Sequence, residues 1–218
     1  MAPPNAAVGA LGMSRPARSD GALAPFTAGK ELRRKALHLA TAVVPVLYAR
    51  GLPRESLLFL LAIGTLAALA IEWLRRVHPG SRSLFNHTVG SLLRPHERDS
   101  LSGATWLCLS CFLAVLFLPA VPAVAAMWCA TIGDSIAALT GRAWSGLRNA
   151  QAPIGKTLVG SLACWGVSAA GVWWLTGIPA ASALTVGAAA AVAEYPSAPF
   201  DDNFRVMLVA GVVALLLT

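Results

Sequence analysis

Residues 123–140 read AVAAMWCATIGDSIAALT, and Asp134 is the single charged residue in this 18-residue stretch. A run of this length and composition predicts an α-helix that crosses a bilayer, because about 20 apolar residues span the hydrocarbon layer. A charged side chain at the centre of such a helix costs roughly 2.5–3.5 kcal/mol, so ionisable residues in spans usually carry a function. Asp134 is therefore the first candidate site residue. Its alternative role is that of a structural acid paired with a nearby arginine.

The polar loop after this helix carries two basic residues beside short glycine motifs. Gly141-Arg142 ends the helix, and residues 153–157 read PIGKT, so that Lys156 opens the next apolar helix. Arginine and lysine bind phosphate, and carboxylates bind Mg²⁺ together with phosphate. Asp134, Arg142 and Lys156 therefore suggest a phosphate-bearing ligand with a divalent ion. The alternative for the two basic residues is anchoring at the membrane interface.

The motif around Lys156 does not form a P-loop. The glycine that a P-loop needs five residues before Gly155 is Ala150, and no strand precedes the motif. Gly160 and Ser161 are expected to allow close approach of the backbone, either to a phosphate or to a neighbouring helix.

The composition places the chain among integral membrane proteins. It has 218 residues, of which 56% are hydrophobic and 12% charged, with a mean hydropathy of +0.65. We expect an all-α, polytopic helix bundle. The net charge of +7 comes from residues that flank apolar runs, which favours topology and anionic lipid over nucleic acid as its explanation. Residues 1–28 predict a disordered leader, and residues 29–218 form one membrane domain.

Seven membrane helices are expected, although six remain an alternative. An interfacial amphipathic helix is predicted within residues 78–100, and Pro45 is expected to kink the first helix. The predicted helices cover residues 31–48, 56–74, 101–118, 123–140, 157–175, a stretch that ends near 193, and a last one that reaches 218.

The charges predict one orientation. With the N-terminus in the cytosol, all but two of the 17 Lys and Arg residues, Arg50 and Arg54, lie on the inner side, as does every acid except Glu55. Transporters more often place ionisable groups near the midplane in paired repeats, and no internal repeat is present. Charge at one membrane face favours an enzyme that takes a cytosolic substrate and a lipid; a transporter or a structural membrane subunit is the alternative.

Further candidate residues lie near the ends of other helices. Arg34 and Lys35 share a helical face with His38 and could bind phosphate or anchor the helix; His38 could instead hydrogen-bond to Glu72 or Glu97. Glu97 and Glu194 could act as a base or orient arginines. Asp201-Asp202-Asn203 could bind a metal or cap the last helix.

In order along the chain, these motifs resemble the CTP-dependent lipid-alcohol kinases, a family that includes dolichol kinase, phytol kinase and the yeast-type diacylglycerol kinase. The resemblance covers the chain from Arg33 to about Arg205. The middle block is also similar to the CDP-diacylglycerol synthases, but the Asp-Asp-Asn ending and the short chain favour the kinases. The motifs that carry the resemblance are Arg34-Lys35-x-x-His38, Glu72, Arg94-x-x-Glu97, Ser102-Gly103-Ala104-Thr105, Gly133-Asp134-Ser135, Gly141-Arg142, Lys156-Thr157, Gly160-Ser161, Glu194 and Asp201-Asp202-Asn203.

The resemblance implies transfer of phosphate from CTP to a lipid alcohol, such as a polyprenol, a phytol-like isoprenoid or diacylglycerol, with Mg²⁺. A phosphatidate-type cytidylyltransferase is the alternative enzyme. The resemblance also implies a site on the cytosolic face of a membrane, which we expect to be a bacterial inner membrane, and leaves a homo-oligomer possible. The implied metal ligands are Asp134, Asp201 and Asp202; the implied catalytic residues are Asp134, Glu97, Asp202 and His38; the implied nucleotide-binding residues are Arg142, Lys156, Thr157, Gly160, Ser161, Asn203, Arg34 and Lys35.

Overall fold

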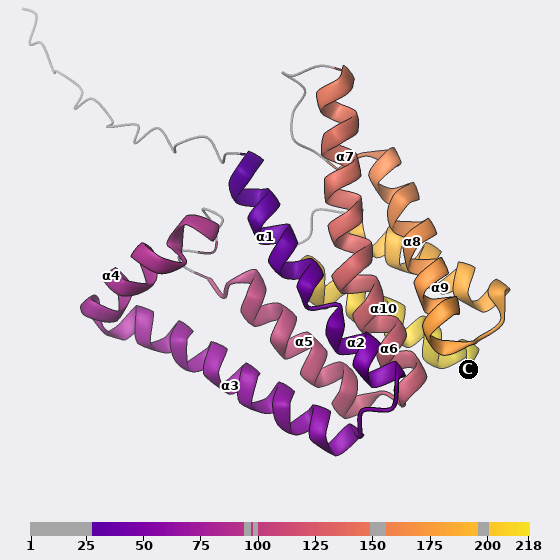
Figure 1. Cartoon of the computed structure of the whole chain (residues 1–218), viewed down its shortest axis with the longest axis horizontal. Coiled ribbons are helices and arrows are strands. Elements are labelled where there is room, and N and C mark those ends of the chain that lie inside the picture. The colour runs from indigo at the N-terminus through magenta and orange to yellow at the C-terminus, as the bar shows by residue number, and fades with distance from the viewer. Residues whose placement is uncertain (1–27, 94–96, 98–99, 149–155, 196–200) are drawn as a thin grey trace, which may run out of the picture.

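A computed structural model describes residues 28–93, 97, 100–148, 156–195 and 201–218 (Figure 1). These ranges form α-helices and short 3₁₀ or π turns without any strand, which confirms the all-α prediction. The predicted leader lies outside them, apart from Ala28, which begins the first helix.

The first predicted helix is two helices, α1 (Ala28–Ala40) and α2 (Val43–Ala49). The break falls at Thr41 and Ala42, whose N–H groups bond the carbonyls of His38 and Leu39 in tight turns. Pro45 explains the position of the break, because it has no N–H to donate to the carbonyl of Thr41 four residues earlier. The predicted kink is therefore a break one turn before the proline.

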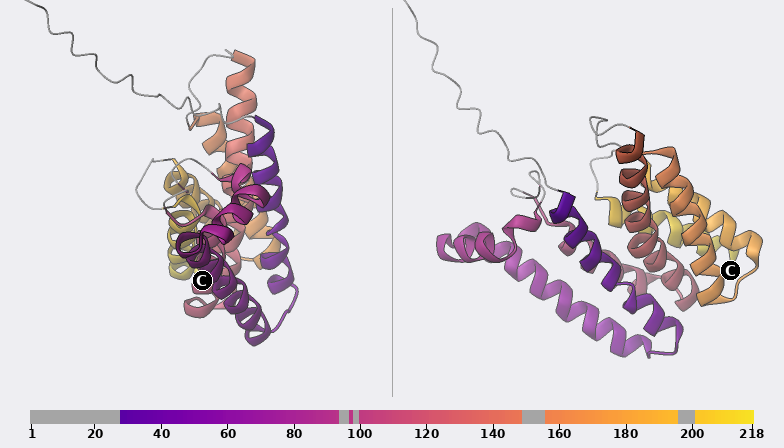
Figure 2. Two further views of the ribbon diagram at one scale, coloured as in Figure 1. Left: turned by 90° about the vertical axis from the view of Figure 1, so that its left-hand side faces the viewer. Right: turned by 45° about the horizontal axis from the view of Figure 1, so that its top comes forward.

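The next helices lie together on one side of the bundle, with α5 between α3 and two inner helices, α6 (Ala120–Trp128) and α10 (Asp202–Leu217). They are α3 (Arg54–Val77), α4 (Pro79–Thr88), the 3₁₀ turn η1 (Gly90–Leu92) and α5 (Gly103–Phe117). Helix α3 packs on α5 and α4 and leaves large apolar side chains exposed along its length, as expected for a lipid-facing helix. In Figure 2 α3 and α4 lie on one side of α1, with α8 and α9 on the other.

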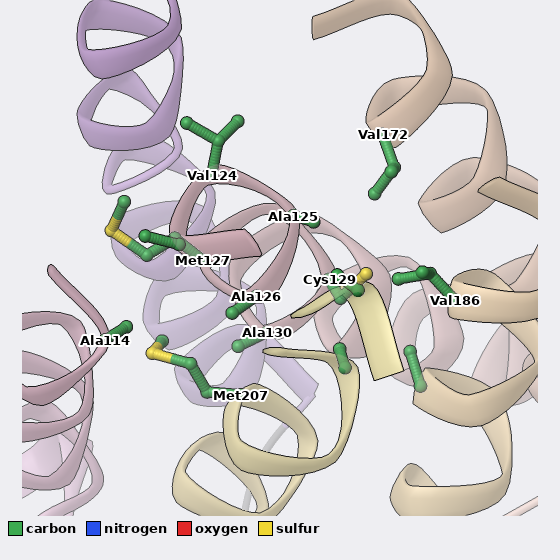
Figure 3. Packing of buried hydrophobic residues seen from close by; sticks show 14 of the residues in the cluster. Ala114, Val124, Ala125, Ala126, Met127, Cys129, Ala130, Val172, Val186 and Met207 are labelled. Carbon is green, nitrogen blue, oxygen red and sulfur yellow. The ribbon is translucent and has the colours of Figure 1, made fainter. Parts of the chain in front are cut away.

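The central helix runs without interruption from α6 (Ala120–Trp128) through a π-helical turn (Cys129–Gly133) into α7 (Asp134–Arg148). Helices α8 (Leu158–Thr176), α9 (Ala180–Glu194) and α10 (Asp202–Leu217) pack around it. Small side chains let these helices approach closely, as Ala126 of α6 and Ala130 of the π-helical turn illustrate beside Met207 of α10 (Figure 3).

The structure has a helix in each of the seven predicted apolar segments, but they differ in length. Among the described residues, three helical stretches are long and apolar enough to cross a membrane by themselves: Arg54–Val77, Ala120–Ser145 and Leu158–Thr176. Helices α5 and α9 are apolar but shorter, at 15 residues or about 22 Å each. A helical membrane bundle is therefore confirmed, whereas seven crossings stay a prediction.

The two ends of the bundle differ in charge. Gly103, at the start of α5, lies among charged side chains, whereas the other end of α5 is bound by Arg54, whose Nη2 donates to the Leu116 carbonyl at 2.8 Å. Fifteen helical residues separate these ends by about 22 Å. The charged end, which includes the start of α1, carries the candidate site (Figure 1).

Candidate active site

The first part of the site is a buried ion pair between α1 and α7. Lys35 Nζ donates to Asp134 Oδ2, and the two residues are only 3% and 6% exposed. Burying two charges is costly unless they are paired, so this contact determines how α1 lies against the central helix. The partner of Asp134 is thus a lysine 99 residues away in the chain, and not the nearby arginine considered in the sequence analysis.

His38 lies one turn after Lys35 on the same face of α1. Its Nε2 is 3.1 Å from the Ala130 carbonyl oxygen, to which an Nε2–H donates. The expected bond from His38 to Glu72 or Glu97 is not formed. Glu72 instead accepts hydrogen bonds from Arg75 Nε at 2.7 Å and from the Ser102 N–H at 2.9 Å.

A π-helical turn directly precedes Asp134. Such turns insert one residue into an α-helix and often occur at functional sites. The turn spans Cys129–Gly133, and a Cβ placed on Gly133 would lie 2.4 Å from Ser168 Oγ. Glycine at 133 therefore lets α8 pack closely beside the turn that presents Asp134.

The second part of the site joins α8, α9 and α10 around Lys156. Lys156 Nζ lies 3.0 Å from Glu194 Oε1 and 3.4 Å from Asp202 Oδ1, and it also donates to the Glu194 carbonyl oxygen. Arg205 holds Asp202 from the other side at 2.8 Å. Asp134 lies within electrostatic reach of Lys156, so the two parts form one charged cluster.

Asp201 and Asp202 have different roles at the start of α10. Asp201 Oδ1 accepts from the Asn203 N–H at 2.9 Å and caps the helix, as the alternative interpretation proposed, whereas Asp202 is in ion pairs. Burial raises the pKa of Asp201 to about 6, and the nearby charges of Asp202 and Asp134 act in the same direction. Asp201 is therefore partly protonated near pH 6, and a bound metal ion would displace that proton.

Gly103 connects this cluster to Glu97. Its N–H donates to Glu97 Oε1 at 3.3 Å, and its carbonyl accepts from Asn203 Nδ2 at 3.3 Å. A Cβ on Gly103 would lie 3.2 Å from Glu97 Oε1, 3.6 Å from Arg34 Nη1 and 3.7 Å from Asp201 Oδ2. Arg34 Nη1 is itself 3.8 Å from Glu97 Oε1. The glycine leaves room for three charged groups from separate parts of the chain.

Sequence reasoning missed Arg75 and Arg205 as residues that hold this arrangement. Arg75 Nη2 donates to the carbonyls of Glu97 at 3.0 Å and Ser100 at 2.7 Å, which positions the segment that carries Glu97. Arg205 Nε donates to the Ala193 carbonyl at 2.6 Å, which ties α10 to the end of α9. Each arginine follows an acid by three positions, Arg75 after Glu72 and Arg205 after Asp202, so each pair shares a helical face. This spacing could have identified them in the sequence.

The remaining predicted nucleotide-binding residues have local contacts in the structure. Thr157 caps α8 by accepting from the Gly160 N–H at 3.1 Å, and a Cβ on Gly160 would lie 2.6 Å from the Ala137 carbonyl oxygen. Gly160 therefore serves the approach of α8 to α7. Ser161 Oγ is buried and has no hydrogen-bond partner among the described residues. Residues 153–155 of the predicted motif lie outside the described ranges.

Arg142 lies two turns beyond Asp134 on α7, about 12 Å along the helix axis. Its Nε donates to the Ala138 carbonyl oxygen at 3.3 Å. The role of Arg142 in binding a nucleotide stays a prediction.

The carboxylates suit a metal ion that is shared with a substrate. Within the part of the chain that the structure describes, no three His, Cys, Asp or Glu side chains gather into a ready-made metal site. Mg²⁺ commonly uses one or two carboxylates and completes its shell with phosphate and water. Asp134 and Asp202 each hold a lysine ammonium group, which shows that positive charge is stabilised at both positions.

Comparison with known proteins gives two matches. No model of a protein family matches the chain, and no solved structure matches it. The CTP-dependent diacylglycerol kinase 1 of Saccharomyces cerevisiae is 26% identical over 160 residues, which are 72% of this chain and 55% of that protein. The protein of the same name from Schizosaccharomyces pombe is 26% identical over 151 residues, 66% of this chain and 67% of that protein.

The chain thus spans little more than half the length of the S. cerevisiae protein. Both relatives are named as kinases of the kind that the motif order resembles. These similarities support membership of the chain in the CTP-dependent lipid kinase family.

Proposed function

We propose that the chain transfers the γ-phosphoryl group of CTP to the hydroxyl of a membrane lipid alcohol. The observation that carries the proposal is the cluster in which Lys35 and Lys156 meet Asp134 and Asp202 at one end of an apolar bundle. Three of these residues belong to α1, α7 and α10, and Lys156 lies just before α8. Both relatives are named CTP-dependent diacylglycerol kinase, which supports CTP as the donor.

The cluster provides what a triphosphate needs. Phosphoryl transfer depends mainly on positioning and on neutralising the charge of the phosphate oxygens. Lys35 and Lys156 are held by carboxylates in the free protein, and phosphate oxygens would replace those carboxylates as their partners. Asp134, with Asp201 or Asp202, would then hold Mg²⁺, which neutralises phosphate charge when bound.

Glu97 is the group placed to take the proton of the acceptor. Its side chain is buried, one oxygen accepts from the Gly103 N–H, and Arg34 lies nearby. The hydroxyl oxygen forms a bond to the γ-phosphorus, the bond from that phosphorus to the β-phosphate oxygen breaks, and CDP leaves. The proton of the hydroxyl passes to the Glu97 carboxylate.

Labelled nucleotide distinguishes this reaction from its alternative. Purified protein in lipid nanodiscs receives Mg²⁺ and CTP labelled at either the α- or the γ-phosphate. The lipid acceptor is diacylglycerol or a polyprenol in one set of reactions and phosphatidate, the acceptor of the alternative reaction, in another. Label from the γ-position in the lipid supports the kinase, whereas label from the α-position with release of pyrophosphate establishes the cytidylyltransferase. Lys156→Met should lose activity, while Glu55→Gln, on an exposed residue at the start of α3, should keep it.

The proposal places the site at the cytosolic side of the membrane. The basic residues, apart from Arg50 and Arg54, belong to segments on that side in the predicted orientation. A cysteine introduced beside Arg82 of α4 should react with a membrane-impermeant maleimide only in inverted vesicles. Reaction in intact cells would place the site on the opposite side.

A further inference from the structure

A cavity of about 330 Å³ lies beside the charged cluster, lined in part by residues of α1, α3, α4 and α5. Figure 1 shows the arrangement of these four helices. This volume is near the lower limit of small-molecule sites, about 300–1,000 Å³. Lys35, Lys156 and Asp134, which form the ion pairs of the cluster, do not line it, whereas Arg34 and Asn203 do. The cavity therefore adjoins the proposed nucleotide-binding groups without containing the two lysines. Its apolar wall includes Leu37, Ile71, Phe85, Val89, Leu92 and Leu93.

One end of the cavity is polar. Arg34, Glu97 and Asn203 line it there, and Gly103 lies between them. Asn203 is 6% exposed; its Nδ2 donates to Gly103, while its Oδ1 has no hydrogen-bond partner among the described residues. A buried acceptor without a donor is unfavourable, and the hydroxyl of a ligand would supply the missing donor.

The charge at this end favours a neutral head group. The Arg34 guanidinium and the Glu97 carboxylate lie 3.8 Å apart, and Glu72, which also lines the cavity, is ion-paired with Arg75. Counted over the described residues alone, these pairs leave little net charge for an anionic ligand, and the Glu97 carboxylate would repel a phosphate. An alcohol both donates to Asn203 Oδ1 and carries no charge.

The other end of the cavity opens onto the apolar surface of the bundle. Leu37 and Ile71 line it and are nevertheless 60% and 49% exposed. Exposed apolar side chains continue along α3, including Leu66 and Ile63. Phe85 of α4 closes one wall, with the Arg75 guanidinium 5.2 Å from its ring centre. A chain could pass from the cavity directly into the bilayer.

We propose that this acceptor cavity binds the hydroxyl end of a long-chain lipid alcohol, with the hydroxyl at Asn203 and Glu97 and the chain leaving between α1 and α3. The inference rests on the proposed function, because it assigns the acceptor of that reaction to a particular pocket. It also names the chemistry of the head group, which is a neutral hydroxyl on an apolar lipid.

A substitution that fills the cavity tests the inference by kinetics. Ala68 of α3 lines the cavity, whereas Ala70, two residues later, is exposed and does not line it. Ala68→Phe should lower kcat/KM for the lipid alcohol by about tenfold or more, and leave the affinity for CTP within about twofold. Ala70→Phe is the matched control and should change neither value. Equal acceptor kinetics in the two variants would overturn the inference.

Photo-crosslinking tests the same site without turnover. A long-chain alcohol that carries a diazirine two carbons from its hydroxyl is added to wild-type protein in nanodiscs, and the labelled peptides are mapped. Label should fall on residues 68–72, 85–93 and 103–107, compete with unlabelled alcohol, and disappear in Ala68→Phe but persist in Ala70→Phe. If Ala68→Phe does not fold, the position of the label in the wild-type protein still tests whether the alcohol binds in the cavity.

The two arms separate failure of the cavity from failure of the proposed function. Phosphorylation of a lipid alcohol with label on α8 or α9 instead would overturn the acceptor cavity and keep the kinase. Competed label in the cavity without transfer from CTP would keep a lipid-alcohol site and refute the proposed reaction.

Discussion

Removing one member of the Lys35–Asp134 pair should destabilise the protein strongly. Lys35→Met leaves the Asp134 carboxylate buried without its cation, and breaking a buried pair in this way costs about 3–5 kcal/mol. A domain of 150–250 residues changes its melting temperature by about 2–4 °C per kcal/mol, so the expected drop is roughly 6–20 °C. Thermal unfolding of the detergent-solubilised protein, followed by tryptophan fluorescence, measures it.

The double variant Lys35→Met/Asp134→Asn separates stability from activity. It removes both charges, so most of the lost melting temperature should return, because buried ion pairs are often no more stable than neutral replacements. CTP-dependent activity should nevertheless be lost in both variants, since neither retains the lysine that would bind phosphate. A double variant that regains activity with its stability would show that the pair is purely structural.

An ion pair with one exposed partner provides the control. Arg76 is 46% exposed and lies 3.6 Å from Glu72, which is buried and keeps its ion pair with Arg75 when Arg76 is replaced. Surface ion pairs contribute about 0–1 kcal/mol, so Arg76→Met should lower the melting temperature by at most a few degrees. The reasoning would be refuted if Lys35→Met and Arg76→Met had the same small effect, because Lys35 would then not be buried against Asp134.

Three further outcomes are expected. Because the pKa of Asp201 is raised to about 6, its protonated form is favoured in the metal-free fold, and the stability that this proton provides is lost as the pH rises through 6. Mg²⁺ would compete with that proton, so Mg²⁺-dependent CTP affinity should strengthen between pH 5 and pH 7 in the wild type and not in Asp201→Asn; calorimetric titration at several pH values measures this. Gly103→Ala puts a methyl group 3.2 Å from Glu97 Oε1 and should displace that carboxylate. The kcat for the lipid acceptor should fall about tenfold or more, with a small change in melting temperature. An unchanged kcat would argue against Glu97 as the group that accepts the proton. Gly160→Ala places its methyl group 2.6 Å from the Ala137 carbonyl oxygen. Overpacking of this kind costs about 1–3 kcal/mol, so the melting temperature should fall by several degrees. An unaltered melting temperature would mean that α7 and α8 are not in close contact there.

The positions of the helices were largely predictable from the sequence. Long apolar runs with few charges specify α-helices, because the backbone of a membrane span must satisfy its own hydrogen bonds. The stretch at 123–140 lies inside the central helix, and the amphipathic segment after α3 forms α4. The break in the first helix was placed only approximately, since it falls at Thr41 while the proline that causes it is Pro45.

The candidate residues were predictable by type but not by partner. An acid in an apolar helix signals a function through its cost alone, which is how Asp134 stands out. The contact of His38 with the Ala130 carbonyl carries no such signal, because any backbone carbonyl near the ring could have served. The same holds for Gly103, whose importance depends on three side chains from other segments.

The sequence by itself determined that the chain forms an apolar helical bundle whose charged groups collect at one end. Helix length, hydropathy and charge are local properties, so they can be recognised without knowing the fold. Only the tertiary structure decided that Lys35 pairs with Asp134, that Lys156 joins Glu194 to Asp202, and that an apolar cavity lies beside them. The physical reason is that these contacts depend on how helices far apart in the chain pack and how small residues set their separation, which no local pattern encodes.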